Sequence, residues 1–134
     1  MFAEYDRLLG CPFSEDYWSD EGVLLAVNAL FDFEGKDWDE LANAVPARPV
    51  EWLIRCADTL GDVRDDRASG LLIRFLRIEN EDLQVASLDS INALSGMGVQ
   101  FGEHRSELVT AMKHVKTEGR VVALMMESLL KKLR

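Results

Sequence analysis

Residues 50–76 read VEWLIRCADTLGDVRDDRASGLLIRFL, and their apolar side chains recur every three or four positions. This spacing is the period of an α-helix, in which positions i, i+3, i+4 and i+7 share one face. Pro49 suits a first helical turn, where its missing N–H costs nothing, and Gly61 is typical of the residue that follows a helix. The stretch therefore predicts two amphipathic helices, over residues 49–60 and 66–77, joined by an acidic turn.

The helical period extends on both sides of this stretch, whereas the alternating apolar and polar runs typical of strands are absent. We therefore predict an all-α fold of about seven helices, the other five over residues 20–31, 38–45, 81–94, 103–116 and 120–133. Polar residues that can cap predicted helices are Asp37, whose capping box Glu40 would complete, Asn80, and Asp65 or Asp66. The helix over residues 20–31 is apolar on so many sides that we expect it to be mostly buried.

Corresponding apolar residues also recur at about the length of a helix pair. Leu60, Leu94 and Leu129 are separated by 34 and 35 positions, and Leu72 and Leu108 by 36. Such spacings are typical of solenoids, in which each helix pair is one repeat. We therefore expect antiparallel helix pairs to stack from residue 49 onward. The residues expected in the core include Leu53, Ile54, Leu72, Phe75, Leu88, Leu108, Met112 and Leu129.

Residues 49–95 resemble HEAT-type repeats. The similarity is carried by residues 56–62 (CADTLGD), 65–68 (DDRA), 71–76 (LLIRFL), 81–88 (EDLQVASL) and 91–94 (INAL). They show an acidic turn, an Ala-rich first helix and a Leu-rich second helix. The resemblance implies a HEAT-like α-solenoid over residues 49–134. We expect residues 1–134 to form a single domain, in which residues 1–48 are an N-terminal cap or a degenerate repeat.

The length and composition favour a protein that needs no metal or disulfide to fold. The chain has 134 residues, 48% of them hydrophobic, which is enough to build a continuous core. Only two cysteines occur, and Cys56 lies on an apolar helical stripe, so we interpret it as a small buried hydrophobic residue in a reducing compartment. Residues 1–6 lack the basic and apolar regions of a secretory signal, and no apolar run is long enough to span a bilayer. We therefore expect a cytoplasmic protein with no membrane contact.

The net charge of −9 is unevenly distributed. Residues 1–66 hold 16 acids and 5 bases, a net of −11, whereas residues 67–134 hold 8 acids and 10 bases, a net of +2. The acidic half argues against nucleic acid as a partner, because phosphates would be repelled. It favours a basic protein partner, although the acids could equally serve only to keep the surface solvated.

Aromatic and acidic residues are interleaved near the N-terminus, where 8 of the 11 aromatic residues lie in the first 38 positions. Aromatic residues dominate binding hot spots, and acids attract a basic partner. Phe31 and Trp38 lie on predicted apolar stripes and are expected in the core, whereas Tyr17, Trp18 and Phe33 fit these stripes less well. The predicted partner-binding residues are Asp16, Trp18, Asp20, Phe33, Glu34, Asp37, Asp39 and Glu40, together with Asp62, Asp65 and Asp66 in the acidic turn.

No catalytic or metal-binding pattern stands out. His104 and His114 are ten positions apart and lie on different faces of one predicted helix, unlike the i, i+4 pair of a helical zinc site. The turn 62–67 lacks the alternating oxygen ligands, the glycine and the final glutamate of a calcium loop. No nucleophile elbow, phosphate loop or dinucleotide fingerprint occurs. We therefore expect no metal, no cofactor and no enzyme activity.

Small acidic HEAT-like proteins of this length resemble bacterial immunity proteins, which neutralise secreted or contact-dependent toxins by binding them. This resemblance implies a cytoplasmic, non-enzymatic inhibitor of a cognate basic toxin domain, often a nuclease, whose active site or substrate groove it would cover. The alternative is a HEAT-like scaffold or regulatory subunit that binds a peptide or helix of another protein. The oligomeric state stays open at this point.

Overall fold

A computed structural model of the protein describes residues 1–115 and 120–133, and over these residues the fold is all-helical, without a strand. The α-helices are α1 (Phe2–Gly10), α2 (Glu15–Tyr17), α3 (Val23–Phe31), α4 (Gly35–Ala44), α5 (Val50–Leu60), α6 (Asp66–Leu76), α7 (Glu81–Gly96), α8 (Arg105–Met112) and α9 (Arg120–Leu133). A π-helical turn, Trp18–Gly22, joins α2 to α3, and short 3-10 turns occupy Val45–Ala47 and Gly102–His104.

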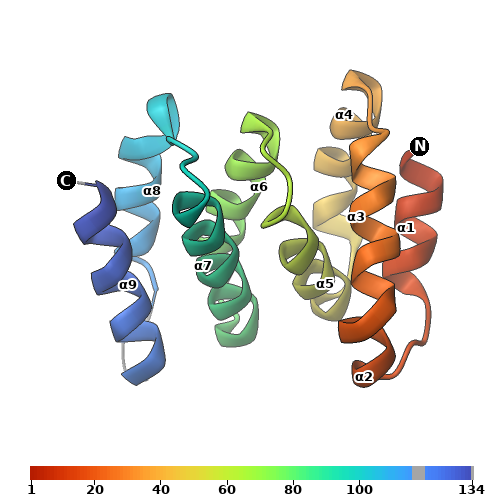
Figure 1. The fold of residues 1–134 in the computed structure, drawn as a ribbon, viewed down its shortest axis with the longest axis horizontal. Coiled ribbons are helices and arrows are strands. Elements are labelled where there is room, and N and C mark those ends of the chain that lie inside the picture. Colours follow the sequence, from red (N-terminus) through yellow and green to blue (C-terminus); the bar gives the residue numbers. More distant parts are fainter. Residues whose placement is uncertain (116–119, 134) are drawn as a thin grey trace.

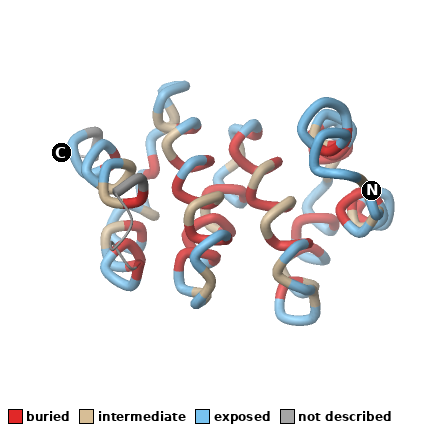
Figure 2. Tube along the Cα trace, turned by 90° about the horizontal axis from the view of Figure 1, so that it is seen from below, coloured by how far each residue is buried: buried red, intermediate tan, exposed pale blue. Residues whose placement is uncertain are grey.

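The helices lie side by side along the long axis of the molecule, with α1 at one end and α9 at the other (Figure 1). Helix α5 packs on α3 and α7, α7 packs on α9, and α6 packs on α8, while α6 also contacts α5 and α7. Buried residues lie on the facing sides of the helices and exposed residues on the outer sides (Figure 2). The buried apolar side chains form one connected core from Phe2 to Leu129.

The local signals in the sequence set the helix boundaries from residue 50 onward. Asp65 caps α6 by accepting a hydrogen bond from the N–H of Arg67 (2.9 Å), and Asn80 caps α7 through the N–H of Leu83 (3.0 Å), as predicted. Helix α7 ends at Gly96, and Gly98 follows with a positive φ of 86°. Helix α8 ends at Met112 and residues 113–115 are not helical, so the predicted extension of this helix to residue 116 is wrong, although Lys116 itself lies outside the described residues.

The predicted core is confirmed with one exception. Seven of the eight residues are buried, whereas Ile54 is only half-buried, because it lies at the edge of the α5 face and lines an open hollow beside Trp18. Cys56 is completely buried, and burial raises the pKa of its thiol to about 12. A thiol with this pKa stays protonated at neutral pH, in agreement with its interpretation as a hydrophobic core residue.

Gly61 has a different role from the one that its position suggested. Its φ is −69°, in the right-handed region, so this position does not require the left-handed conformation that glycine favours. A Cβ atom at Gly61 would instead lie 2.7–2.9 Å from the Oγ, Cβ and Cα atoms of Ser90 on α7. The missing side chain therefore allows α5 and α7 to approach closely, and the Ser90 hydroxyl donates a hydrogen bond to the carbonyl of Ala57 (2.6 Å).

Helix α1 was not among the predicted helices. It buries Phe2, Tyr5, Leu8 and Leu9 and packs against α3, α4 and α5. Tyr5 is completely buried, its hydroxyl is hydrogen-bonded to Thr59 of α5 (2.7 Å), and its ring meets the ring of Trp52 edge-on. The N-terminal helix therefore belongs to the same core as α5.

Helix α3 is less buried than its composition predicted. Ala26, Val27, Ala29 and Leu30 face the core, but Leu24, Leu25 and Phe31 are 59%, 46% and 63% exposed. The expectations that this helix is mostly buried and that Phe31 is a core residue are therefore wrong. The physical reason is that α1 and α5 pack only on one side of α3, which leaves its opposite side in solvent.

Helix α4 begins earlier than expected. Its N-cap is Glu34, and Asp37 is the third helical residue of a capping box, so the predicted cap at Asp37 and box residue at Glu40 are both wrong. The observed capping box lies three positions before the predicted one. Its capping residue is Glu34, which is longer than the Ser, Thr, Asp or Asn side chain that usually caps a helix. Among the described residues, no helix is both long and apolar enough to cross a membrane.

Candidate functional site

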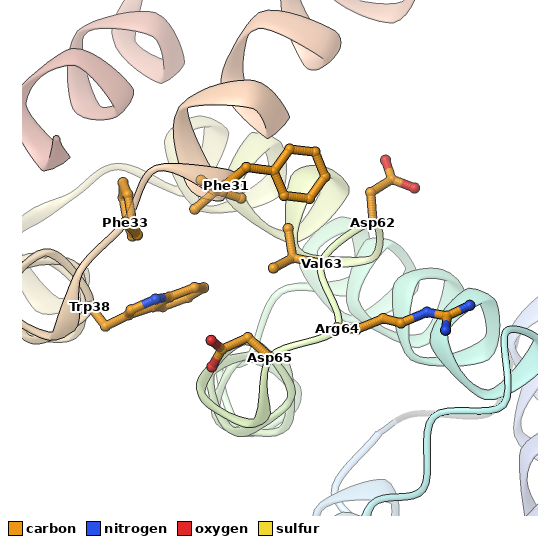
Figure 3. Close-up of a pocket in the computed structure, with 8 residues that line it drawn as sticks. Phe31, Phe33, Trp38, Asp62, Val63, Arg64 and Asp65 are labelled. Atoms are coloured by element: carbon orange, nitrogen blue, oxygen red, sulfur yellow. The ribbon is translucent and has the colours of Figure 1, made fainter.

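An open hollow of about 460 Å³ lies where the end of α3 and the start of α4 meet the turn between α5 and α6. Its lining residues are Leu30, Phe31, Phe33, Trp38, Asp62, Val63, Arg64 and Asp65 (Figure 3). The hollow therefore joins two segments that are about 30 positions apart in the sequence. Of its lining residues, Phe33, Asp62 and Asp65 were predicted to bind a partner, whereas Phe31 and Trp38 were expected in the core.

The base of the hollow is aromatic and apolar. The ring of Phe33 meets the ring of Trp38 edge-on, with centroids 5.2 Å apart, and meets Tyr5 of α1 in the same way at 5.3 Å. Leu30, Trp38 and Val63 are buried, whereas Phe31 stands exposed at the rim. An aromatic ring in solvent beside a preformed apolar base is typical of the anchor of a protein interface.

Acidic residues lie on both sides of this base, but they are not equally exposed to a partner. Asp65 binds the guanidinium of Arg67 through both carboxylate oxygens (3.0 and 2.9 Å), and Arg67 in turn stacks over the ring of Trp38, with its carbon 5.3 Å from the centroid. These hydrogen bonds from Arg67 lower the pKa of Asp65. Figure 3 shows the Asp65 carboxylate pointing toward Trp38, while Arg64 points away from it, and Asp62 is exposed on the other side.

The other predicted binding residues lie in several places outside this hollow. Asp39 and Glu40 are exposed on α4 after Trp38 but do not belong to the lining of the hollow, and Glu34 caps the same helix. Asp16 and Asp20 are also exposed, but they lie at the opposite end of α3 (Figure 1). Asp66 faces a different neighbour, because its carboxylate is 3.0 Å from Nε2 of His104.

Trp18 is not available to a partner in the way that we expected. It is only 7% exposed, its indole N–H donates to Asp58 (3.2 Å), and the Arg55 guanidinium lies 4.9 Å from its ring centroid. Gly22 makes this packing possible, because a Cβ at that position would lie 2.7 Å from the Trp18 ring. Trp18 therefore stabilises the fold.

Arg55 and Asp58 were missed by the sequence analysis. Arg55 donates hydrogen bonds to the carbonyls of Leu9, Cys11 and Phe13 (3.3, 2.6 and 2.9 Å), so it ties the segment after α1 to α5. The pKa of Asp58 is raised, mainly because it is partly buried, although its hydrogen bond from Trp18 opposes this shift. The signal in the sequence was the occurrence of both charged residues, three positions apart, in a helix whose other residues are apolar except for Glu51 and Thr59.

Asp37 is also a structural residue. It is 3% exposed, its Oδ2 accepts from the N–H of Glu34 (2.9 Å), and its Oδ1 accepts from the N–H of Phe2 (3.1 Å). These backbone groups, Glu34 first and then Phe2, hold the pKa of Asp37 below its usual range, although burial opposes them. Asp37 thus caps α4 and holds the start of α1, which corrects its assignment to the partner-binding surface.

We expect Asp37→Ala to lower the thermal unfolding midpoint most at neutral pH. The folded-state pKa of Asp37 is depressed, so its contribution is present above the unfolded value of about 3.9 and is lost as the pH falls through the folded pKa. Thermal melts followed by circular dichroism between neutral pH and about pH 3 would measure this. Asp39→Ala, which removes an exposed acid of the same helix, is the control. A difference from wild type that stays constant over this range would contradict the assignment.

The histidines do not form a metal site in the described part of the chain. Burial lowers the pKa of His104, but hydrogen bonds with Asp66 and Glu107 outweigh burial, so the pKa is raised overall. His114 is exposed. Among the described residues, no three His, Cys, Asp or Glu side chains gather closely enough to hold a metal ion.

Comparisons with protein-family models, with curated proteins and with solved structures found no match for this chain. The arrangement of the residues around the hollow is therefore the basis for proposing a function.

Proposed function

We propose that this chain is a non-enzymatic binding protein whose N-terminal half docks on a basic surface of a partner protein. The observation that carries this proposal is the hollow in which exposed Phe31 stands over an aromatic base with Asp62 in its lining, while Asp39 and Glu40 are exposed on α4. Aromatic anchors supply most of the energy of an interface, and acids around them select and attract a basic partner.

The HEAT-like interpretation of the fold is part of the same proposal. Helices α5, α7 and α9 contact one another in order, and α6 contacts α8 beside them, which is the pattern expected for stacked antiparallel pairs. In such a solenoid each pair contacts only its neighbours, and the inter-helix turns of successive pairs lie along one edge. The acidic turn 61–65 would then be one part of a binding edge.

The partner class that suits these features best is a basic toxin domain, and the protein would be its immunity protein. The support is the combination of small size, a net charge of −11 over residues 1–66 and a HEAT-like arrangement. Exposed carboxylates such as Asp62 in the hollow and Asp39 on α4 would occupy positions that phosphates take when a nuclease binds its substrate, and the protein would cover the active site or substrate groove. The second candidate is a scaffold or regulatory subunit that binds a helix, which the exposed apolar side of α3 favours.

The proposal is tested by reversing the charge of Asp39, Glu40 and Asp62, which are exposed and bear no structural hydrogen bond described above. After the partner has been captured from the native host and identified, both rate constants are measured across a salt series. We expect each lysine variant to associate more slowly, with the largest difference at low salt, because electrostatic steering raises association rates by about 10- to 1000-fold and is screened by ions.

Two controls accompany this experiment. Glu79→Lys makes the same charge change in the turn after α6, at the far end of that helix from the hollow, and Lys113→Glu changes the charge at the end of α8. Both variants should associate like wild type once the change in net charge is taken into account. The proposal would be contradicted if the partner proved to be acidic. It would also be contradicted if the association rate depended neither on salt nor on any of the three acidic reversals, because the acids would then only solvate the surface.

A further inference from the structure

We infer that the exposed side of α3 is a docking surface for a basic amphipathic helix of the partner protein. This inference rests on the proposed function and names the segment of the partner that binds. It is carried by the exposed residues Leu24, Leu25 and Phe31, which we call the α3 stripe. The charge around the stripe and its connection to the hollow determine which occupant fits.

The α3 stripe follows the helix axis. Leu24 and Phe31 are seven positions apart, so they lie on the same side of the helix, two turns or about 10 Å from each other. Leu25 widens the stripe next to Leu24, while Ala26, Ala29 and Leu30 hold the opposite side of α3 in the core. Apart from Asn28, which is exposed between Leu24 and Phe31, α3 is apolar all round, and such a helix is normally covered on every side. Here the core covers only one of those sides.

The stripe runs into the hollow described above. Phe31 is the last residue of α3 and also lines the hollow, together with Phe33 and Val63 (Figure 3). An apolar surface therefore extends from the first turn of α3 to the turn between α5 and α6, interrupted on α3 only by the exposed amide of Asn28. A partner helix lying along α3 can pack its apolar side on Leu24 and Leu25 and place a side chain at its end in the hollow.

The charge beside the stripe has one sign along the chain, whereas the hollow also has Arg64 in its lining and Arg67, paired with Asp65, over Trp38. Residues 8–35 contain six acidic residues and no lysine, arginine or histidine. Asp20 and Glu21 lie just before α3, and Asp32 and Glu34 lie just after it, all exposed. The occupant of this surface must therefore bring positive charge at both ends of its apolar face. A basic amphipathic helix has this chemistry, with apolar residues at i, i+3, i+4 and i+7 and lysine or arginine elsewhere.

The same charges argue against two other occupants. If a second copy docked through its own α3 stripe, the acids of both copies would face each other, and like charges in an interface oppose association. An anionic membrane surface would be repelled in the same way. A basic helix gains both apolar burial and charge pairing, so it is the occupant that the surface fits.

The test uses a synthetic peptide of about four helical turns, with leucines on one face and lysines elsewhere. Binding to the full chain is measured by fluorescence anisotropy, and the contacted residues are mapped by amide chemical shifts. We expect shifts concentrated in residues 20–34. Leu24→Ser and Phe31→Ser should each weaken binding about tenfold, as is usual for the loss of an apolar anchor.

The matched control is Leu124→Ser, because Leu124 on α9 is 54% exposed, close to the 59% of Leu24. This variant should bind like wild type. A second control peptide has the same composition in an order that spreads leucine over all faces, and it should bind about tenfold more weakly. Circular dichroism confirms that each protein variant is folded, which is expected because both serines replace solvent-exposed side chains.

Several results would overturn the inference. Equal binding by wild type and Leu24→Ser would do so, as would equal binding of both peptides, since charge alone would then explain it. A dimer that sedimentation detects in wild type and that Leu24→Ser abolishes would show that a second copy covers the stripe. The proposed function fails separately. It is contradicted if the charge reversals at Asp39, Glu40 and Asp62 leave the association rate of the partner unchanged. If these reversals slow association but Leu24→Ser does not, only the inference fails.

Discussion

Replacing Tyr5 by alanine is expected to lower the free energy of unfolding by about 3–5 kcal/mol, the range for truncating a large buried aromatic residue. Tyr5 is completely buried and connects α1 to the rest of the core, with its hydroxyl hydrogen-bonded to Thr59 and its ring against Trp52 and Phe33. Removing the ring opens a cavity between α1 and α5. It also removes one of the two aromatic contacts that hold Phe33 in the base of the hollow.

Equilibrium unfolding in urea measures this loss, and two variants separate its causes. Tyr5→Phe keeps the ring and loses only the hydrogen bond to Thr59, so we expect a cost of about 0.5–1.5 kcal/mol. Tyr17→Ala removes an aromatic residue that is exposed on α2, and its effect should stay within about 0.5 kcal/mol. If Tyr5→Ala cost no more than Tyr17→Ala, α1 would not be packed in solution as the structure shows.

The second large effect is expected for Leu72→Ala, which should cost about 2–5 kcal/mol. Leu72 is completely buried on α6, which packs against α5, α7 and α8, so the cavity would open where several helices meet. Leu129→Ala on α9 should cost a similar amount, because Leu129 is also completely buried. The urea midpoint should fall without a large change in the slope, since the unfolded surface changes little.

Leu124→Ala is the control for these truncations. It makes the same chemical change on α9 at a position that is 54% exposed, where we expect a change within about 0.5 kcal/mol. A loss below about half a kcal/mol for Leu72→Ala would mean that the assigned faces of the helices are wrong. A large loss for Leu124→Ala would instead mean that the exposed side of α9 is covered in solution.

The candidate site was predictable only in pieces. Partner-binding residues were predicted both at Phe33, Glu34 and Asp37 and in the acidic turn at Asp62, Asp65 and Asp66, yet nothing in the sequence indicates that these two segments face each other. Their meeting depends on how α3 and α5 pack, which is a contact between distant positions in the chain. For the same reason, Trp18 and Asp37 looked like surface residues, although their hydrogen bonds to Asp58 and to the Phe2 backbone place them in the fold.

Helix α1 shows where a local signal was present but too short. Phe2, Tyr5 and Leu9 are spaced as a helical face requires, but they span only two turns, and isolated helices of that length are marginal. Its stability comes from packing against α3, α4 and α5 rather than from its own residues. Tertiary contacts therefore determine whether such a helix forms, even when its periodicity is visible in the sequence.

What the sequence by itself determined are the features that depend on residues within about four positions of each other. The helices from α5 to α7, the caps at Asp65 and Asn80 and the core faces of α5 and α6 follow from such local hydrogen bonds and periodicity. Only the tertiary structure decided that a single side of α3 is covered, because apolar residues lie on nearly all sides of this helix and the helical period does not show how many of those sides another element covers. Packing against α1 and α5 chose that side, and it left Leu24, Leu25 and Phe31 in solvent beside the hollow.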